Sequence, residues 1–503
     1  MRRGTFVLGL ILSSGAAASC GLAPPRSSAP PTAPTTAPDE SFRAHRPEPE
    51  PREPFLPPVA HLFTLPNKMG LLVVDRPGGS MVAAELVVRG GTAAFPWEPP
   101  AAFRLMVSTL MRGTATRSET EIYQTMNTGL FDLQTSVGDV WVSVRARATT
   151  ASFDAALELM RDIALHPSFP APGVETERQR QLAKSPREAE DTEWIARRNL
   201  YRAVFGPSHP YARRPQPGAA ALAKITREDV VRVWQESIDP AHTILVVTGD
   251  VDEADLRERV AALFGDWRSR PSRRSPLPVP PASPIAPRLI VVDRPGAPQA
   301  SVFYGASIAP IDAPEQLAQL VLRNLLGGMR SSVLETRLRD ELGATWFGDA
   351  KMEARLGAGM LWWEGSVARE RTADALVALE RRIRELRDRG PNPDELVAAK
   401  SIMVRSMPRD LETVQGMASL FAEIAAYGLP GDRLRTLGAR LDATSADAVR
   451  AVVPEPIRMK AVVVGDVASL RAPLLALGWG PIEEHDADGK VVRIISEPRR
   501  AAD

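Results

Sequence analysis

The side chains best suited to bind a catalytic metal ion are few and far apart in this sequence. The chain has six histidines and one cysteine, and no two histidines lie within ten residues of each other. A zinc peptidase usually pairs two histidines four residues apart, because both imidazoles then lie on one face of a helix. Neither H-x-x-E-H nor H-E-x-x-H occurs anywhere in the chain. The sequence therefore predicts no metal site and no cofactor, and we expect an isolated histidine such as His209 to have a structural role.

The single cysteine, Cys20, follows a segment that is typical of an export signal. The basic pair Arg2-Arg3 precedes a short apolar run, Thr5–Leu12, which is too short to span a bilayer. The following AASC motif resembles the lipid-modification site of bacterial lipoproteins. We therefore expect residues 1–20 to be a lipoprotein-type signal peptide and Cys20 to be a lipid anchor. An ordinary cleaved signal with an incidental cysteine is the alternative.

Two proline-rich stretches divide the remaining chain. Residues 21–58 hold 12 of the 46 prolines and are predicted to form a disordered tether. A second stretch, 268–288, is predicted to be a linker between an N-terminal half, 59–267, and a C-terminal half, 289–483. Residues 484–503 are assigned to a tail.

The composition is that of a globular protein without a strong charge bias. Hydrophobic residues make up 44% of the chain, charged residues make up 24%, and the net charge is +1. A nucleic-acid-binding protein would show a basic excess or a basic stripe, and neither is present. We therefore expect no nucleic-acid partner.

Two short sequences occur twice at nearly the same offset. Leu71–Gly78 (LLVVDRPG) returns as Leu289–Gly296 (LIVVDRPG) near the start of the C-terminal half. Val246–Val251 (VVTGDV) returns as Val462–Val467 (VVVGDV) near its end. An internal repeat of such a long period indicates two related domains rather than a solenoid.

The expected strands and helices follow one order in both halves. The strands, by residue number, are 71–74, 81–88, 139–148 and 243–247, and then 289–292, 301–306, 361–367 and 460–464. The helices are 103–111, 153–163, two within 174–205, 226–236 and 256–264, and then 314–326, 376–386 and those within 394–427. Strands that are mixed with paired helices favour an α+β fold in which helices cover a sheet.

This order, together with a set of short signposts, resembles the pitrilysin/insulinase family of metallopeptidases, and most of all its bacterial group related to the mitochondrial processing peptidase. The signposts are Met111–Thr114, Leu165–Phe169, His209–Tyr211, Ile225–Asp229, Val246–Val251, Leu326–Gly328 and Leu338–Gly343. The resemblance covers about residues 60–483. It implies two homologous halves, each a mainly antiparallel sheet covered by helices, which close as a clam around a central cavity of peptide size.

The resemblance also shows where the catalytic motif of the family should lie. Active members carry H-x-x-E-H on a helix, where two histidines bind zinc and the glutamate activates the metal-bound water. Carried over from Arg112-Gly113-Thr114, this motif falls on residues 104–108, which read RLMVS. Arg104 and Ser108 replace the histidines, and Val107 replaces the glutamate. An arginine would repel a metal ion, and valine has no proton to transfer.

Three further positions implied by the resemblance have lost the residue that active members use. The third zinc ligand, a glutamate, falls on Lys184 or the next residue. The arginine and tyrosine that hold the substrate carbonyl fall on Val333 and Trp346, although two flanking arginines could substitute for the lost one. Trp346 would either keep an aromatic wall at the cavity or pack in the core. We therefore expect no catalytic residues and no zinc in this chain.

Three functions are consistent with this sequence. The favoured hypothesis is a catalytically inactive peptidase homologue, a lipoprotein subunit that pairs with an active zinc peptidase paralogue and forms half of a peptide chamber. The alternatives are a stand-alone lipoprotein that binds or scaffolds peptides or unfolded protein segments, and an active zinc metalloendopeptidase that uses unrecognised residues. A lipid anchor would place the protein in the bacterial cell envelope, on the periplasmic side of a membrane, most simply the outer one.

Overall fold

The computed structural model describes residues 55–213, 219–270, 272–276 and 287–496. The predicted signal peptide, Cys20 and the tether up to Pro54 lie outside this range. The described residues from Phe55 onward belong to one compact unit. No helix within them is both long enough and apolar enough to cross a bilayer.

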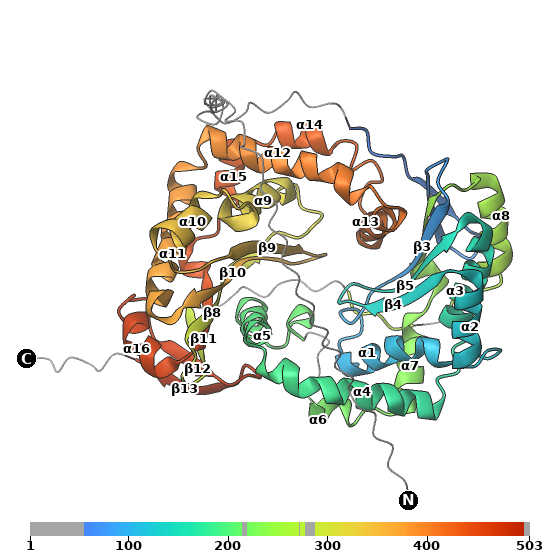
Figure 1. The fold of residues 1–503 in the computed structure, drawn as a ribbon, viewed down its shortest axis with the longest axis horizontal. Helices are drawn as coiled ribbons and strands as arrows, with labels where there is room; N and C mark the ends of the chain where they lie inside the picture. The colour runs from blue at the N-terminus through green and yellow to red at the C-terminus, as the bar shows by residue number, and fades with distance from the viewer. Residues whose placement is uncertain (1–54, 214–218, 271, 277–286, 497–503) are drawn as a thin grey trace, which may run out of the picture. The chain divides into compact units, whose positions relative to one another are not determined.

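The N-terminal half consists of six strands and eight helices in the described part of the chain (Figure 1). Its strands are β1 (His61–Thr64), β2 (Gly70–Asp75), β3 (Met81–Arg89), β4 (Asp132–Val137), β5 (Trp141–Thr149) and β6 (Thr243–Gly249). Its helices are α1 (Pro100–Thr109), α2 (Glu119–Gly129), α3 (Phe153–Leu165), α4 (Ala171–Glu190), α5 (Thr192–Phe205), α6 (Ala219–Leu222), α7 (Arg227–Ser237) and α8 (Glu253–Phe264).

The C-terminal half repeats this plan with additions at its end. Its strands are β7 (Leu289–Asp293), β8 (Gln299–Ile308), β9 (Gly348–Ala354), β10 (Gly359–Ala368), β11 (Lys460–Gly465), β12 (Ile482–His485) and β13 (Val491–Ile495). Its helices are α9 (Gln316–Arg323), α10 (Val333–Thr336), α11 (Thr372–Arg389), α12 (Pro393–Asp410), α13 (Val414–Tyr427), α14 (Leu437–Asp442), α15 (Ala446–Ala451) and α16 (Val467–Leu475).

Each half builds one sheet around the two repeated sequences. The first sheet has the order β1-β2-β6-β3-β5-β4, and the second has the order β13-β12-β7-β11-β8-β10-β9. The repeated sequences form the strands β2 and β6 in the first sheet and β7 and β11 in the second, and each of these pairs is parallel. Parallel strands are usually buried on both faces, which explains their uninterrupted apolar sequences. Within the described residues the only other parallel pair is β7–β12, so the sheets are mainly antiparallel.

The two faces of each central strand pack against different halves. Leu71 and Val73 point into the core under the helices of their own half, whereas Leu72 and Val74 point into a second core that contains Phe421 of α13. The side chains of a strand alternate between its faces, so one strand can serve both cores. Helix α13 of the C-terminal half thus covers β3 and β6 of the first sheet.

The second sheet is covered in the same reciprocal way. Helix α5 of the N-terminal half packs against β8 and β11 (Figure 1). Leu200 and Val204 of this helix share a core with Ile290, Val292 and their neighbours on the second sheet. Each sheet is therefore covered by a helix from the other half. These contacts explain why the described halves form one compact unit.

The predicted α+β fold with mainly antiparallel sheets is confirmed by this architecture. The sequence patterns missed several elements, namely β1, β4, β9, β12, β13, α2, the short helices α6 and α10, and the helices that follow α13. Part of the stretch assigned to a tail belongs to the second sheet, because residues 491–495 form β13, which pairs with β12 at the sheet edge. The start of the predicted linker also packs against the first half, since Arg274 donates hydrogen bonds to the backbone carbonyls of Arg89 and Ser237.

Candidate functional site

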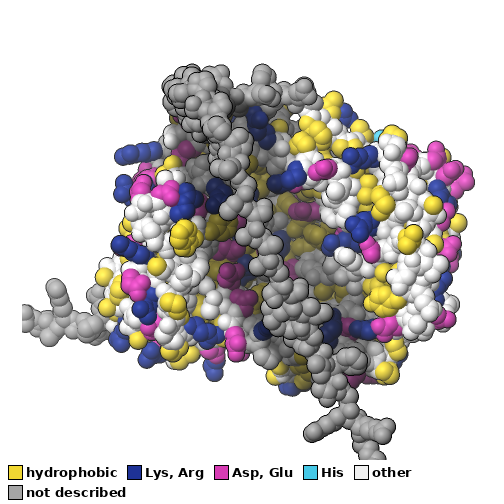
Figure 2. Space-filling model, in the orientation of Figure 1, with side chains coloured by type: hydrophobic (Ala, Val, Ile, Leu, Met, Phe, Trp, Pro, Cys, Tyr) yellow, Lys and Arg dark blue, Asp and Glu magenta, His cyan; other side chains and the backbone are white. Residues whose placement is uncertain are grey.

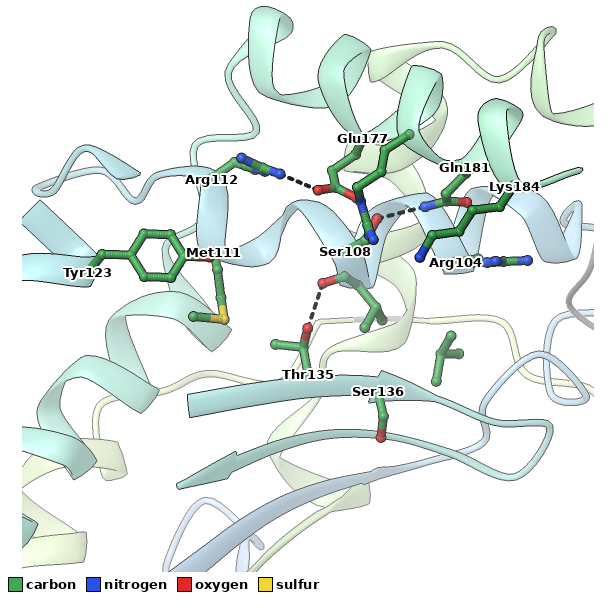
Figure 3. Close-up of a pocket in the computed structure, with 13 residues that line it drawn as sticks. Arg104, Ser108, Met111, Arg112, Tyr123, Thr135, Ser136, Glu177, Gln181 and Lys184 are labelled. Atoms are coloured by element: carbon green, nitrogen blue, oxygen red, sulfur yellow. Dashed lines mark hydrogen bonds and ion pairs between the residues drawn. The ribbon is translucent and has the colours of Figure 1, made fainter. Parts of the chain in front are cut away.

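The helices α1 and α4 and the strand β4 enclose a pocket of about 670 Å³ (Figure 3). The pocket is lined by Arg104, Val107, Ser108, Met111, Arg112, Tyr123, Thr135, Ser136, Val137, Glu177, Arg180, Gln181 and Lys184. Four of these residues, Arg104, Val107, Ser108 and Lys184, are the first-half positions that the sequence assigned to the lost metal site. The fold therefore brings these four positions together at one pocket.

Helix α1 presents its polar residues to the pocket because its apolar residues occupy the core. Phe103 and Met106 are fully buried beneath the helix, whereas Arg104 and Ser108, four residues apart, lie on the pocket side. Val107 lines the pocket with only 4% of its surface exposed. The carbonyl oxygen of Val107 accepts a hydrogen bond of 2.9 Å from Thr135 Oγ1, which ties α1 to β4.

Helix α4 contributes a column of polar side chains one turn apart. Glu177, Gln181 and Lys184 extend from this helix toward α1 (Figure 3). Gln181 Nε2 donates to Ser108 Oγ at 2.9 Å, and Ser108 Oγ in turn donates to the Leu105 carbonyl at 3.1 Å. At the position that the resemblance assigns to a zinc-binding histidine, a hydroxyl therefore joins the two helices.

Among the described residues that line the pocket, Glu177 is the only carboxylate, and two arginines hold it. Its side chain is 3% exposed. Arg180 Nη2 lies 2.6 Å from Glu177 Oε2, and Arg112 donates to Oε1 of the same carboxylate. Burial raises the pKa of Glu177, but the hydrogen bonds from Arg180 and Arg112 outweigh it and hold the pKa below the usual value of 4.5. The carboxylate of Glu177 is therefore ionised, and its charge is balanced by Arg112 and Arg180.

The donor set of this pocket does not fit a zinc ion. Zinc needs three or four converging imidazole, thiolate or carboxylate ligands, and the pocket offers one carboxylate that is already bound by arginines. Arg104 and Lys184 are cations that repel a divalent ion. In the described residues as a whole, no three histidine, cysteine, aspartate or glutamate side chains are grouped so that they could hold a metal.

The two positions of the second half that the resemblance assigned to substrate binding lie outside this pocket. Val333 begins α10, and Trp346 lies in the loop before β9 with 87% of its surface exposed. Neither residue lines the pocket. The interpretation of Trp346 as a core residue was wrong, because the indole ring stands in solvent. The flanking Arg337 pairs with Glu341 and Glu385 within its own half.

His209 has the structural position that the sequence indicated. Its Nδ1 accepts a hydrogen bond from the backbone N–H of Tyr211 at 3.2 Å, and its ring stacks on Phe205 with the ring centres 5.1 Å apart. Burial and the positive charge of Arg355 lower the pKa of His209. A neutral ring within an aromatic cluster fits a packing role.

Arg355 forms a buried junction between the halves that the sequence did not reveal. It lies 3.2 Å from Asp139, also pairs with Glu353, and stacks over Tyr211 at 4.8 Å from the ring centre. The Tyr211 hydroxyl donates to the Leu356 carbonyl at 2.7 Å. Asp139 and Arg355 belong to different halves and are distant in the sequence, so no local pattern could have linked them.

A second pocket of about 510 Å³ lies beside this junction and is lined by both halves. It includes Trp141 and Arg145 from the first half and Arg355 and Tyr427 from the second. It shares Ser136 and Val137 with the pocket of Figure 3, since both residues line each of them. The end of β4 therefore connects the pocket of Figure 3 with the boundary between the halves.

Comparison with known proteins agrees with this architecture. The family model described as the peptidase M16 inactive domain matches residues 224–403. This part of the chain is therefore similar to the inactive domain of M16 peptidases. The matched residues span the end of the first half and much of the second, so they do not include Arg104–Ser108. No curated protein matches the sequence at a significant level.

Solved structures share the M16 fold at low sequence identity. A peptidase M16 inactive domain from Pseudomonas fluorescens aligns with a TM-score of 0.74 and 18% identity, covering 81% of this chain and 98% of that one. A protease from Helicobacter pylori aligns with a TM-score of 0.71 and 16% identity, covering 81% of this chain and 99% of that one. At such identities the likeness establishes the fold alone, and the chemistry depends on the side chains of this chain.

Proposed function

We propose that this M16 protein is a catalytically inactive subunit that pairs with an active zinc peptidase and supplies half of a peptide chamber. The observation that carries the proposal is the identity of the residues at the lost metal position. Arg104, Val107, Ser108 and Lys184 meet at one pocket, and none of them can bind zinc or activate water. A fold that is kept while its reaction centre is replaced fits a binding or assembly role.

The same pocket offers a place for an extended peptide. Strand β4 is an edge strand, since within the described sheet it pairs only with β5. Its residues Thr135, Ser136 and Val137 line the pocket, and the last two also line the second pocket. An extended peptide can add to an exposed edge by main-chain hydrogen bonds while its side chains enter neighbouring pockets. The chamber in this proposal therefore follows the edge of β4.

Pairing and membrane attachment complete the proposal. A subunit without a metal site needs a partner that carries H-x-x-E-H in order to contribute to proteolysis, and acyl chains on Cys20 would hold the pair at the membrane. Lipid attachment and the periplasm-facing location rest on the sequence of residues 1–20.

Affinity purification of the full-length chain from detergent-solubilised membranes tests this function. We expect a zinc-containing M16 paralogue to copurify in a fixed ratio, and we expect cleavage of an unfolded peptide only when both chains are present. The chain purified alone should contain no stoichiometric zinc by metal analysis.

Two other outcomes would assign one of the alternative functions. Peptide binding by the isolated chain, without a paralogue in the purified material and without cleavage, would indicate the stand-alone binding lipoprotein. Stoichiometric zinc in the isolated chain, together with peptidase activity that a chelator abolishes, would indicate an active metalloendopeptidase and overturn the proposal.

A further inference from the structure

A third pocket, of about 330 Å³, lies where the two halves and the segment between them meet, and we propose that it binds a small organic carboxylate through Arg89. We refer to it as the linker pocket. Its lining comes from the first half, the start of the predicted linker and the second half, and includes Arg89, Tyr211, Arg274, Pro276, Leu356 and Tyr427. The proposal goes beyond the peptide chamber, since no described residue of the linker pocket lines the pocket of Figure 3.

Arg89, the last residue of β3, brings a cation without a partner to the linker pocket. Among the described residues, no hydrogen bond and no ion pair reaches its guanidinium, and its Nε atom is shielded from solvent. Burial lowers the pKa of Arg89, and no carboxylate opposes this effect. A buried cation costs free energy unless an anion or a hydrogen-bond acceptor satisfies it. An anionic ligand would therefore find an unsatisfied partner here.

Two carboxylates lie close to the linker pocket, and each already has a cationic partner. Asp139 is the one carboxylate among the described lining residues, and it lies 3.2 Å from Arg355. Asp239 is 3.5 Å from Nδ1 of His242, and its charge opposes the lowering of the pKa of Arg274 by burial. Burial and the charge of Arg274 lower the pKa of His242, so that the ring is neutral at neutral pH. The charge of the pocket arginine at the end of β3 is therefore left without compensation.

An uncompensated charge is unusual in this chain. The net charge is only +1, and on the face of the molecule in Figure 2 basic and acidic side chains are interspersed rather than gathered by sign. Residues 277–286 follow Pro276 in the sequence and contain no ionisable side chain, so they supply no counter-charge. A cavity with one sign of charge concentrates ligands of the opposite sign.

The remaining lining suits the apolar part of a small acid. Ala94, Leu356 and the rings of Tyr211 and Tyr427 contribute apolar surface from both halves. Burial raises the pKa of Tyr211 to about 12 and also raises that of Tyr427, so neither phenol adds a negative charge. The planar guanidinium of Arg89 can engage both oxygens of a carboxylate. The volume lies near the lower end of the range for ligand sites, which favours a small acid or the last residue of a peptide.

Isothermal titration calorimetry with the purified full-length chain tests the site and distinguishes these two sources. The probes are two carboxylates, 4-phenylbutyrate and a short N-acetylated peptide that ends in phenylalanine, each with its neutral carboxamide. We expect at least one carboxylate to bind with a Kd of about 1 mM or lower, and we expect its carboxamide to bind at least about tenfold more weakly. Binding of 4-phenylbutyrate would identify free acids as ligands, and binding of the peptide alone would identify a peptide end.

Substitutions then connect the preference for a carboxylate with the linker pocket. Arg89→Gln should reduce the affinity for the carboxylate to that for the carboxamide, and Arg89→Lys should keep part of the preference. Ala94→Leu should weaken the binding of both, because the larger side chain occupies the cavity. The control Arg381→Gln removes an arginine of α11 whose side chain is 68% exposed, and it should behave like the natural chain.

Thermal unfolding separates ligand binding from a merely structural role of Arg89. Without ligand, Arg89→Gln should not lower the Tm, since the removed charge has no partner in the described chain. A saturating concentration of the bound carboxylate should raise the Tm of the natural chain and leave that of Arg89→Gln unchanged.

Three results would overturn the carboxylate site. They are equal affinities for the carboxylates and their carboxamides, a preference that survives Arg89→Gln in a folded chain, and failure of every probe to bind. None of them bears on the proposed pairing with a zinc peptidase, which copurification tests separately.

Discussion

At the residue scale, polar side chains link the two helices of the pocket at positions that the resemblance assigns to zinc ligands. Ser108 and Gln181 form a hydrogen bond between α1 and α4 where an active relative would join the helices through a metal ion. The carboxylate of Glu177 performs a similar task with Arg112 and Arg180. Side-chain hydrogen bonds thus hold the site that a metal would otherwise organise.

Restoring the family residues at four positions should restore a metal site. The variant Arg104→His/Val107→Glu/Ser108→His/Lys184→Glu places two imidazoles four residues apart on α1 and a carboxylate on α4, which is a donor set that zinc accepts. We expect one zinc ion per chain after dialysis, measured by metal analysis. The variant that keeps Lys184 should bind zinc more weakly. A folded fourfold variant that binds no zinc would contradict the placement of these residues around one centre.

Removal of the Glu177 carboxylate should destabilise the chain in a pH-dependent manner. Glu177→Gln leaves Arg112 and Arg180 without their shared anion, and we expect the free energy of unfolding at neutral pH to fall by about 1–3 kcal/mol. The pKa of Glu177 is lowered in the folded state, so its contribution is present above the unfolded value of 4.5 and is lost as the pH falls through the folded value. The difference between the natural chain and the variant should therefore disappear in acid.

Urea denaturation at neutral pH and at about pH 3 measures this difference. Glu175→Gln is the matched control, because Glu175 lies on the same helix but is 48% exposed and pairs with Arg178. Its effect should stay within about 0.5 kcal/mol. If the two substitutions lowered the free energy of unfolding equally, the buried position of Glu177 would make no extra contribution to stability.

At the element scale, the helices α5 and α13 join the two halves, because each of them packs against the sheet of the other half. The ring of Phe421 is fully buried between α13 and the first sheet, although it belongs to the second half. Burial of such a side chain contributes about 1.5–3 kcal/mol, and truncation adds the cost of a cavity. Contacts of this kind make the stability of the first sheet dependent on a distant segment of the chain.

The substitution Phe421→Ala should lower the free energy of unfolding by about 3–5 kcal/mol. Because the lost contact joins the two halves, tryptophan fluorescence and circular dichroism should report one shared shift of the transition rather than loss of one half alone. Val397→Ala on α12 is the control, since Val397 is 63% exposed, and should change stability by about 0.5 kcal/mol or less. Two well-separated transitions in the Phe421 variant would contradict this coupling.

The elements that could be predicted from the sequence are those with a regular local pattern. The central strands have uninterrupted apolar runs. Helix α7 begins at Arg227, directly after Thr226, whose side chain forms a capping box with Asp229. Strand β4 was missed because its sequence, DLQTSV, is mostly polar, as suits an edge strand with one open side. Strand β13 was missed because most of its residues are exposed.

The candidate site was predictable only as far as the family signposts reach. They located Arg104, Val107, Ser108 and Lys184, which the fold brings to one pocket. They did not indicate that Glu177 would hold two arginines, or that Arg355 would meet Asp139 across the halves. Such contacts depend on tertiary packing between residues far apart in the sequence, and no local period encodes them.

At the scale of the whole molecule, the reciprocal covering of the sheets predicts how separated halves behave. Residues 55–276 expressed alone would expose the face of the first sheet that α13 covers, and residues 287–503 would expose the face that α5 covers. Exposed apolar faces of this size promote association. We expect each fragment alone to aggregate, and we expect coexpressed fragments to form a soluble 1:1 complex by size-exclusion chromatography. Two soluble monomeric fragments would contradict this prediction.

The exchange of helices also has a consequence for the order in which the chain can fold. Strand β6 begins at Thr243, whereas the helix that covers it begins only at Val414, after most of the second half. One apolar face of the first sheet therefore remains exposed to solvent until most of the polypeptide has been synthesised. Contacts between segments so far apart in the sequence also form slowly. A ribosome-bound intermediate that still lacks α13 would be a natural client for a chaperone, whereas the finished chain would not.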